Sequence, residues 1–117
     1  MTATWCGPCW DFHQSGTMDN LYNDYGPYGT KNSEMVMSMM IEVDPSTNLA
    51  CLDGSQNCNS ANQGDWKSGT QHPIFNPASS KAASINESYS ISAYPTIYVI
   101  SPSGYIKTFE GLSLIHI

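Results

Sequence analysis

The sequence predicts an α/β domain, and three observations lead to this prediction. Pro8 lies two residues after Cys6, at the expected start of a helix. Backbone N–H groups in the first helical turn have no partner within the helix, so the missing N–H of proline costs no hydrogen bond there. Residues 35–43 form a nearly continuous apolar run, which is typical of a parallel-sheet strand covered on both faces. Residues 96–100, Thr-Ile-Tyr-Val-Ile, have the composition of a strand.

The composition limits the chain to one domain and argues against two classes of partner. Its 117 residues are enough for one compact domain with its own core. Only 12% of them are charged, and ten acids against four lysines give a net charge of −6. Binding to nucleic acid or to an anionic membrane needs clustered cations. No apolar run approaches the ~20 residues of a membrane span, so we expect neither nucleic-acid binding nor membrane insertion.

The N-terminal part predicts a broken helix followed by a strand. Two apolar stripes, at positions 9, 12 and 16 and at positions 18, 21, 22 and 25, point almost oppositely around one helix axis. We therefore expect a helix from about Pro8 that breaks near residues 15–16 and resumes to about Tyr25. The apolar run 35–43 comes next, and its methionines are expected in the core. A buried helix is the alternative there, because Met is a good helix former.

The C-terminal half predicts an insertion, a helix and a hairpin. Residues 45–78 are polar and without period, and they are too many for an ordinary loop, so we expect an ordered insertion. Ser79 or Ser80 can cap a short helix after it. Strand 96–100 then leads through the turn Ser-Pro-Ser-Gly into an antiparallel strand at 105–110.

The strongest chemical signal is the segment Trp5, Cys6, Gly7, Pro8 and Cys9. Cysteines at i and i+3 of a helix start face the same side and can close a small disulfide ring. The unpaired N–H groups at a helix start favour a thiolate at Cys6, by roughly 0.3–2 kcal/mol. This stabilisation alone is seldom enough to lower the pKa of a thiol from about 8.5 to near 7. We therefore expect the Cys9 thiol to donate a hydrogen bond to the Cys6 thiolate, and we expect Cys6 to be moderately acidic. Cys6 would attack a substrate disulfide, and Cys9 would resolve the mixed disulfide.

The alternatives for this pair are a structural disulfide or half of a zinc site. Zinc needs four ligands, usually as two Cys or Cys/His pairs. His13 follows Cys9 by four residues, but the other two cysteines are spaced too widely for a tight second pair. We therefore expect no metal and no cofactor, and we expect His13 to pack rather than to act as a base.

Cys51 and Cys58 enclose a turn-forming segment of six residues. A disulfide between them would close a loop of about eight residues and contribute roughly 2.5 kcal/mol by the chain-entropy relation. Two free thiols or a second redox centre are the alternatives. Four cysteines that pair evenly favour an oxidising compartment, so we expect a structural disulfide here.

At residues 5–9 and at Tyr94-Pro95-Thr96 the chain resembles the thioredoxin-like fold family. The resemblance implies a three-layer α/β/α sandwich with a mixed sheet. It implies that Pro95 is a cis-proline beside the two cysteines and that Tyr94 offers its backbone to the substrate chain. Trp5, Gly7 and Pro8 would share this substrate-binding surface. Residues 44–51 and 64–66 further resemble thioredoxin-like modules of secreted Bacteroidetes proteins.

The resemblance covers residues 1–111 as a partial domain, with 45–78 as an insertion. The family has a central strand directly before the Trp-Cys motif and a helix after the hairpin, whereas only residues 1–3 precede the motif here. We therefore expect a truncated fragment that lacks the first strands and the last helix. Residues 112–117 look like a translated sequencing adapter, so we expect a non-native tail.

Together these features predict a thiol–disulfide oxidoreductase whose catalytic residues are Cys6 and Cys9. Its partners would be protein disulfide substrates and a redox partner protein, and we expect a monomer. An extracytoplasmic bacterial location (periplasmic, cell-surface or secreted) follows from the cysteine usage and the resemblance. The alternative is a non-catalytic binding or structural module of a secreted multidomain protein.

Overall fold

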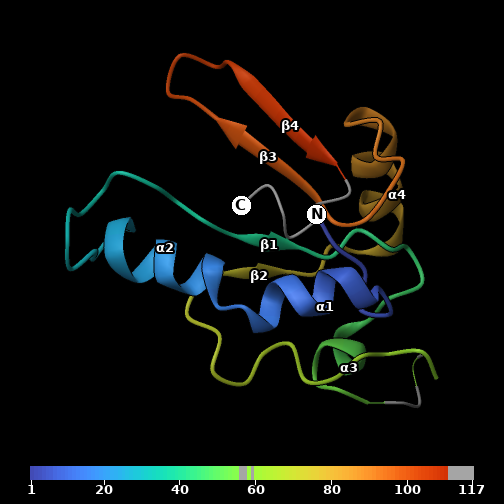
Figure 1. Cartoon of the computed structure of the whole chain (residues 1–117). Coiled ribbons are helices and arrows are strands. Elements are labelled where there is room, and N and C mark those ends of the chain that lie inside the picture. The colour runs from blue at the N-terminus through green and yellow to red at the C-terminus, as the bar shows by residue number, and fades with distance from the viewer. Residues whose placement is uncertain (56–57, 59, 111–117) are drawn as a thin grey trace.

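The computed structural model describes residues 1–55, 58 and 60–110 (Figure 1). Within them the elements are, in order, α1 (Gly7–Gln14), α2 (Thr17–Tyr25), β1 (Met40–Ile41), α3 (Leu49–Leu52), β2 (Ile74–Phe75), α4 (Ser79–Ser88), β3 (Thr96–Ile100) and β4 (Ile106–Glu110). Strand β1 pairs in parallel with β2, and β3 pairs antiparallel with β4. The tail predicted at 112–117 and the predicted domain boundary at residue 111 lie outside the described residues.

The predicted break between the first two helices is confirmed. Gly16 separates α1 from α2 with φ 70°, a left-handed conformation that glycine adopts without steric cost. Just before it, the N–H of Ser15 is bonded to the carbonyl of Asp11 at 3.0 Å, which closes the last turn of α1. The change of direction lets the two apolar stripes face different surroundings.

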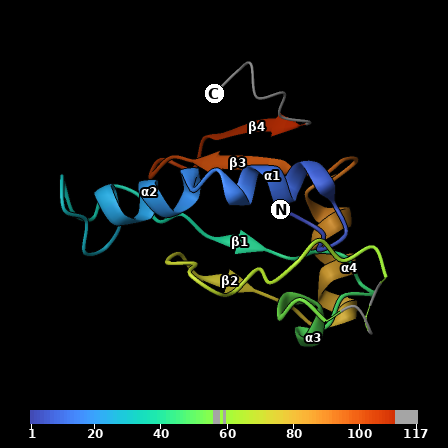
Figure 2. The ribbon, with the colours of Figure 1, turned by 60° about the horizontal axis from the view of Figure 1, so that its bottom comes forward.

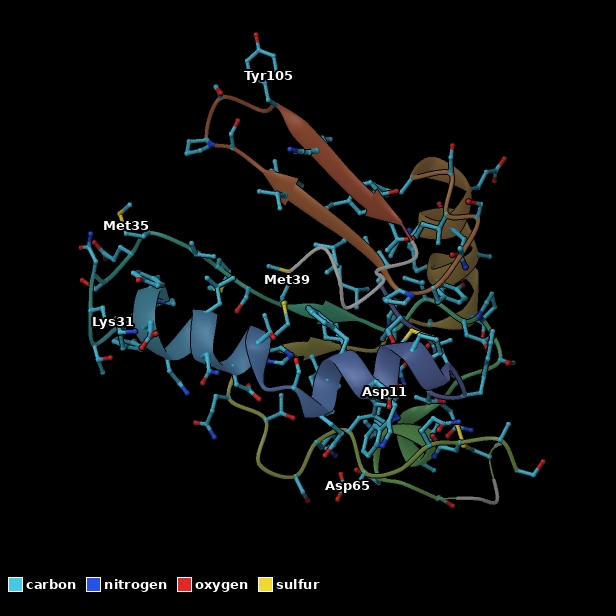
Figure 3. The ribbon with its side chains drawn as sticks, viewed as in Figure 1. Asp11, Lys31, Met35, Met39, Asp65 and Tyr105 are labelled. Carbon is cyan, nitrogen blue, oxygen red and sulfur yellow. A yellow bond between two sulfur atoms is a disulfide. The ribbon has the colours of Figure 1, made fainter. Side chains whose placement is uncertain are left out.

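The prediction of a strand over 35–43, covered on both faces, is wrong for most of that run. Only Met40–Ile41 is strand, and Met40 is buried, whereas Met35 is 64% and Met37 is 54% exposed. Figure 3 labels Met35 in the segment before β1. The N–H groups of residues 35 and 36 are instead bonded to the carbonyl of Tyr25, which ties this segment to the end of α2. Among the described residues no strand pairs with residues 35–39, and the apolar side chains of this segment are exposed, whereas Ser38 is buried.

The segment 45–78 contains structure that the sequence analysis did not predict. Strand β2 adds to the edge of β1, with Met40 opposite Ile74. Helix α3 begins after Asn48, whose side chain accepts the N–H of Ala50 at 2.9 Å, so a helix start does lie close to Cys51. Trp66 of this segment is fully buried. The segment therefore supplies part of one sheet and part of the core.

The predicted helix at 79 and the predicted hairpin are both present. Helix α4 begins at Ser79, but Ala78 is its N-cap, and no side chain caps it, so the predicted serine cap is wrong. In the hairpin turn the N–H of Gly104 donates to the carbonyl of Ser101 at 2.9 Å, and Gly104 has φ 84°. The antiparallel pairing of β3 and β4 runs from Thr96 opposite Glu110 to Ile100 opposite Ile106.

The first residues of the chain join the two sheets. Met1 and Thr96 exchange backbone hydrogen bonds of 2.8 and 3.2 Å. Thr2 pairs in parallel with Glu42 on its other side. Helix α1 then runs along the β1–β2 sheet (Figure 2). The buried core beneath it consists of Ala3, Cys6, Cys9, Met40, Leu52 and Trp66. The start of α1 is therefore held in place by the pairing of residues 1–2 with both sheets.

Candidate functional site

Cys6 and Cys9 lie at the start of α1 and form a disulfide, with their Cα atoms 5.2 Å apart. Cys6 is the N-cap of α1, and its Sγ accepts the N–H of Cys9 at 3.2 Å. Pro8 occupies the first turn, where its missing N–H is not needed. In the reduced state the same N–H group and the helix dipole would stabilise a negative charge on the sulfur of Cys6.

The two cysteines differ in access. Both are nearly buried, with 4% of Cys6 and 3% of Cys9 exposed. Cys6 nevertheless lines a pocket of about 350 Å³, and Cys9 does not. The pocket is lined by Trp5, Cys6, Gly7, Pro8 and residues 91–94. An incoming group can therefore reach the site from the side of Cys6, with Cys9 behind it.

Trp5 forms one wall of this pocket and is held from two sides. Its indole N–H donates to the carboxylate of Asp44. Its ring meets that of Tyr94 edge to face, with centroids 5.8 Å apart. Burial acts to raise the pKa of Asp44, but hydrogen bonds from Ser46 and Trp5 outweigh it and lower that pKa. Asp44 is therefore a carboxylate at neutral pH and a strong acceptor for the indole.

Tyr94 forms the facing wall, and Pro95 stands behind it. The Tyr94–Pro95 peptide bond is cis, and Pro95 is buried without lining the pocket. The hydroxyl of Tyr94 donates to Asn86 Oδ1 at 3.2 Å, and burial raises the pKa of that hydroxyl. Among the described residues neither backbone group of Tyr94 has a hydrogen-bond partner. These groups are available to an extended chain in the pocket.

Gln63 supports the chain on the other side of Trp5, and sequence reasoning missed it. Its backbone N–H donates to the carbonyl of Thr4 at 3.0 Å, and its side-chain amide donates to the carbonyl of Trp5 at 3.1 Å. Next to it, Gly64 approaches the ring of Trp10 so closely that an added Cβ would lie 2.8 Å from a ring carbon. The segment 45–78 thereby holds the backbone that leads into Cys6.

Glu42 is a second residue that sequence reasoning missed. It is fully buried, and burial raises the pKa of its carboxyl to about 7. One carboxyl oxygen accepts the N–H of Asp44 at 2.7 Å. Burial also lowers the pKa of the Met1 amine to about 6, against the opposing effect of Glu42. The only sequence feature that pointed to a buried Glu42 was its position, as an acidic residue within the apolar run 35–43.

Cys51 and Cys58 form a second disulfide, with Cα atoms 5.5 Å apart. The sulfur of Cys58 lies 3.1 Å from the carbonyl oxygen of Ser55. The side-chain amide of Asn62 donates to the carbonyl of Cys51 at 2.7 Å, which ties the following loop to α3. Cys51 is buried, and neither cysteine of this pair lines the pocket at Cys6.

His13 is packed between two aromatic rings. Its ring centroid lies 5.4 Å from that of Trp10 and 5.1 Å from that of Trp66. Burial lowers the pKa of His13, and the residue does not line the pocket at Cys6. Within residues 1–55, 58 and 60–110, no cluster of three or more His, Cys, Asp or Glu could hold a metal ion. No helix among these residues has the length and apolarity to cross a membrane.

Three comparisons with known proteins give no match. No family model, no curated protein and no solved structure matches the chain. The features that bear on function are therefore the geometry at Cys6 and the chemistry of its neighbours.

Proposed function

We propose that the chain is a thioredoxin-like thiol–disulfide oxidoreductase in which Cys6 is the exchanging residue and Cys9 the resolving residue. The observation that carries the proposal is the position of Cys6. Its sulfur accepts a helix N-terminal N–H at 3.2 Å, and Cys6 is among the residues that line the pocket, whereas Cys9 is not. A sulfur in this position is both stabilised as a thiolate and reachable.

The proposed reaction moves two electrons in two exchange steps. In the reduced chain the Cys6 thiolate attacks one sulfur of a protein disulfide, which forms a mixed disulfide and releases the other sulfur as a thiolate. The Cys9 thiolate then attacks the sulfur of Cys6. This forms the Cys6–Cys9 disulfide, releases the second substrate thiolate and leaves the substrate reduced. A dithiol redox partner protein would reduce the chain again by the reverse sequence.

Substrate binding in this proposal uses the walls of the pocket. The unpartnered backbone of Tyr94 would pair with the substrate chain beside the disulfide. The ring of Trp5, 40% exposed, would cover the apolar part of that chain. We further propose an extracytoplasmic bacterial setting, because disulfides such as Cys51–Cys58 persist in oxidising compartments.

One observation favours a second candidate, a binding or structural module with a permanent Cys6–Cys9 disulfide. Both cysteines are less than 5% exposed, and a structural disulfide is usually shielded. The reduction potential distinguishes the two. A potential above about −300 mV agrees with exchange, and one far below it, without turnover of insulin, agrees with the structural role.

Trapping tests the proposed roles directly. Reduced Cys9→Ser should accumulate a mixed disulfide with insulin through Cys6, because no thiol remains to resolve it. Cys6→Ser should accumulate none. Mass spectrometry after acid quenching measures both. Equal trapping by the two variants, or trapping at Cys51 or Cys58, would contradict the assignment.

A further inference from the structure

A second pocket, of about 370 Å³, lies between α3, the loop 67–72 and β2. Its apolar wall is formed by Leu49, Leu52 and Ile74. Lys67 and His72 also line it, and both carry positive charge when they are ionised. None of the lining residues is acidic. In a chain with a net charge of −6 and only four lysines, this pocket combines an apolar wall with two cationic groups.

His72 is held so that one ring nitrogen is left unpaired. The residue is 4% exposed, and its Nδ1 lies 2.8 Å from Asp19 Oδ1. Asp19 also accepts the backbone N–H groups of Gln71, at 2.7 Å, and of His72, at 3.2 Å. Burial acts to raise the pKa of Asp19, but these hydrogen bonds outweigh it and lower the pKa. Asp19 is therefore a carboxylate that accepts a hydrogen bond from Nδ1–H of His72, and among the described residues Nε2 has no hydrogen-bond partner.

Because Nδ1 is paired with Asp19, Nε2 is the ring nitrogen of His72 that can face an anion in the pocket, and in an imidazolium ring it is a hydrogen-bond donor. The other titratable ring near it is that of His13, with its centroid 6.3 Å away. Burial, and then His72, lowers the pKa of His13.

Lys67 supplies the second cationic group, and its ammonium group can form an ion pair with a ligand at little cost in stability. Its Nζ lies 2.6 Å from the carboxylate of Asp53, but both side chains are about half exposed, at 46% and 51%. An exposed pair of this kind contributes little to stability. A carboxylate entering the pocket can therefore share or replace Asp53 as the partner of Lys67.

We propose that this pocket binds a small monocarboxylic acid with a short aliphatic chain. The carboxylate would lie between Lys67 and His72, and the chain would lie against Leu49, Leu52 and Ile74. The pocket volume lies in the range of small-molecule sites, which are mostly apolar with a few polar groups. This proposal does not depend on the redox chemistry at Cys6.

The test compares hexanoate with its neutral analogue hexanamide by NMR titration of the full chain, labelled with ¹⁵N, at pH 6. Hexanoate should cause saturable shifts in residues 49–52 and 67–76 and bind about tenfold more tightly than hexanamide. Lys67→Gln should weaken hexanoate binding by about fivefold, or roughly 1 kcal/mol.

Lys31→Gln is the matched control. Lys31 is also an exposed lysine in an ion pair, with Asp24 at 2.7 Å, but it lies beyond the end of α2 (Figure 3). This variant should leave hexanoate binding unchanged. Equal affinity for hexanoate and hexanamide, equal weakening by the two lysine variants, or no saturation would each overturn the proposal.

Discussion

The two disulfides of this chain have the same bond in opposite surroundings. At Cys6 the neighbouring polar group is a donor, the N–H of Cys9, at 3.2 Å. At Cys58 it is an acceptor, the carbonyl oxygen of Ser55, at 3.1 Å. A donor stabilises a thiolate and an acceptor destabilises it. The sulfur of Cys6 is therefore suited to act as a thiolate in disulfide exchange, whereas the sulfur of Cys58 is suited to remain in its disulfide.

Burial alone does not separate the two pairs, because Cys6 is 4% exposed and Cys51 is 1% exposed. The two cysteine pairs differ instead in the groups that surround them. Cys6 lines a pocket with the free backbone of Tyr94, whereas Cys51 is tied through its carbonyl to Asn62. The direction of neighbouring dipoles and access from a pocket are thus better indicators of exchange chemistry than exposed area.

The largest expected effect separates the two pairs by activity. Cys6→Ser should lower the rate of insulin reduction by roughly a thousandfold or more, because the attacking thiolate is lost. The double variant Cys51→Ser with Cys58→Ser should keep the rate within about threefold of the parent. Turbidity and single-turnover assays measure both rates. A larger loss in the double variant would reverse the roles assigned to the two pairs.

The next effect separates the pairs by stability. Replacing Cys51 and Cys58 by Ala should lower the free energy of unfolding by roughly 2.5 kcal/mol, because a closed loop of about eight residues is released in the unfolded chain. Urea denaturation without reductant measures this loss. An unchanged midpoint and slope would show that this disulfide does not restrain the chain.

Glu42 should produce a pH-dependent effect on stability. Its pKa in the folded chain is about 7, above the ordinary 4.5, so the folded state binds the extra proton. That stabilisation is complete below pH 4.5 and is lost as the pH rises through 7. Glu42→Gln should therefore raise the free energy of unfolding by roughly 3 kcal/mol at pH 8 and change it little at pH 4.5.

Denaturation at the two pH values checks this expectation. The control is Glu87→Gln, which removes an exposed acid on α4 and should have no such pH dependence. If Glu42→Gln destabilised the chain at pH 8, the carboxylate would have to be a stabilising charge in its site.

The smallest effect concerns the wall of the pocket. Asp44 accepts hydrogen bonds from Ser46 and also from the indole of Trp5. Asp65, labelled in Figure 3, makes a similar local turn with Ser68, but within the part of the chain that the structure describes it accepts no indole N–H. Asp44→Asn should lower kcat/KM for insulin reduction by about threefold to tenfold, since the charged acceptor that orients Trp5 is lost. Asp65→Asn should leave it unchanged, and equal losses would remove Trp5 orientation as the cause.

The sequence predicted what depends on neighbours along the chain. The helix break at Gly16 followed from local periodicity, and the hairpin after β3 followed from the turn residues at 101–104. The position of Pro8 predicted a helix from about Pro8, and α1 begins at Gly7. Each of these features is decided within about ten residues, so the sequence carries its signal directly.

The rest depended on pairing between distant segments. The run 35–43 had the composition of a buried strand, but only residues that meet Thr2 and β2 became one. Gln63 reaches the carbonyl of Trp5 across a separation of 58 residues. The burial of Glu42 likewise follows from the segments around it. A single sequence carries no signal for such contacts, so these residues of the site could not be predicted.

Competitive alkylation of the fully reduced chain tests the central claim most directly. The chain would be treated with limiting iodoacetamide at pH 7, and the four cysteines would be compared by peptide mass spectrometry. The account predicts that Cys6 is modified first and about tenfold faster than the other three, since its thiolate is stabilised and lines a pocket. Faster modification of Cys9, or equal rates at Cys6 and Cys58, would contradict it.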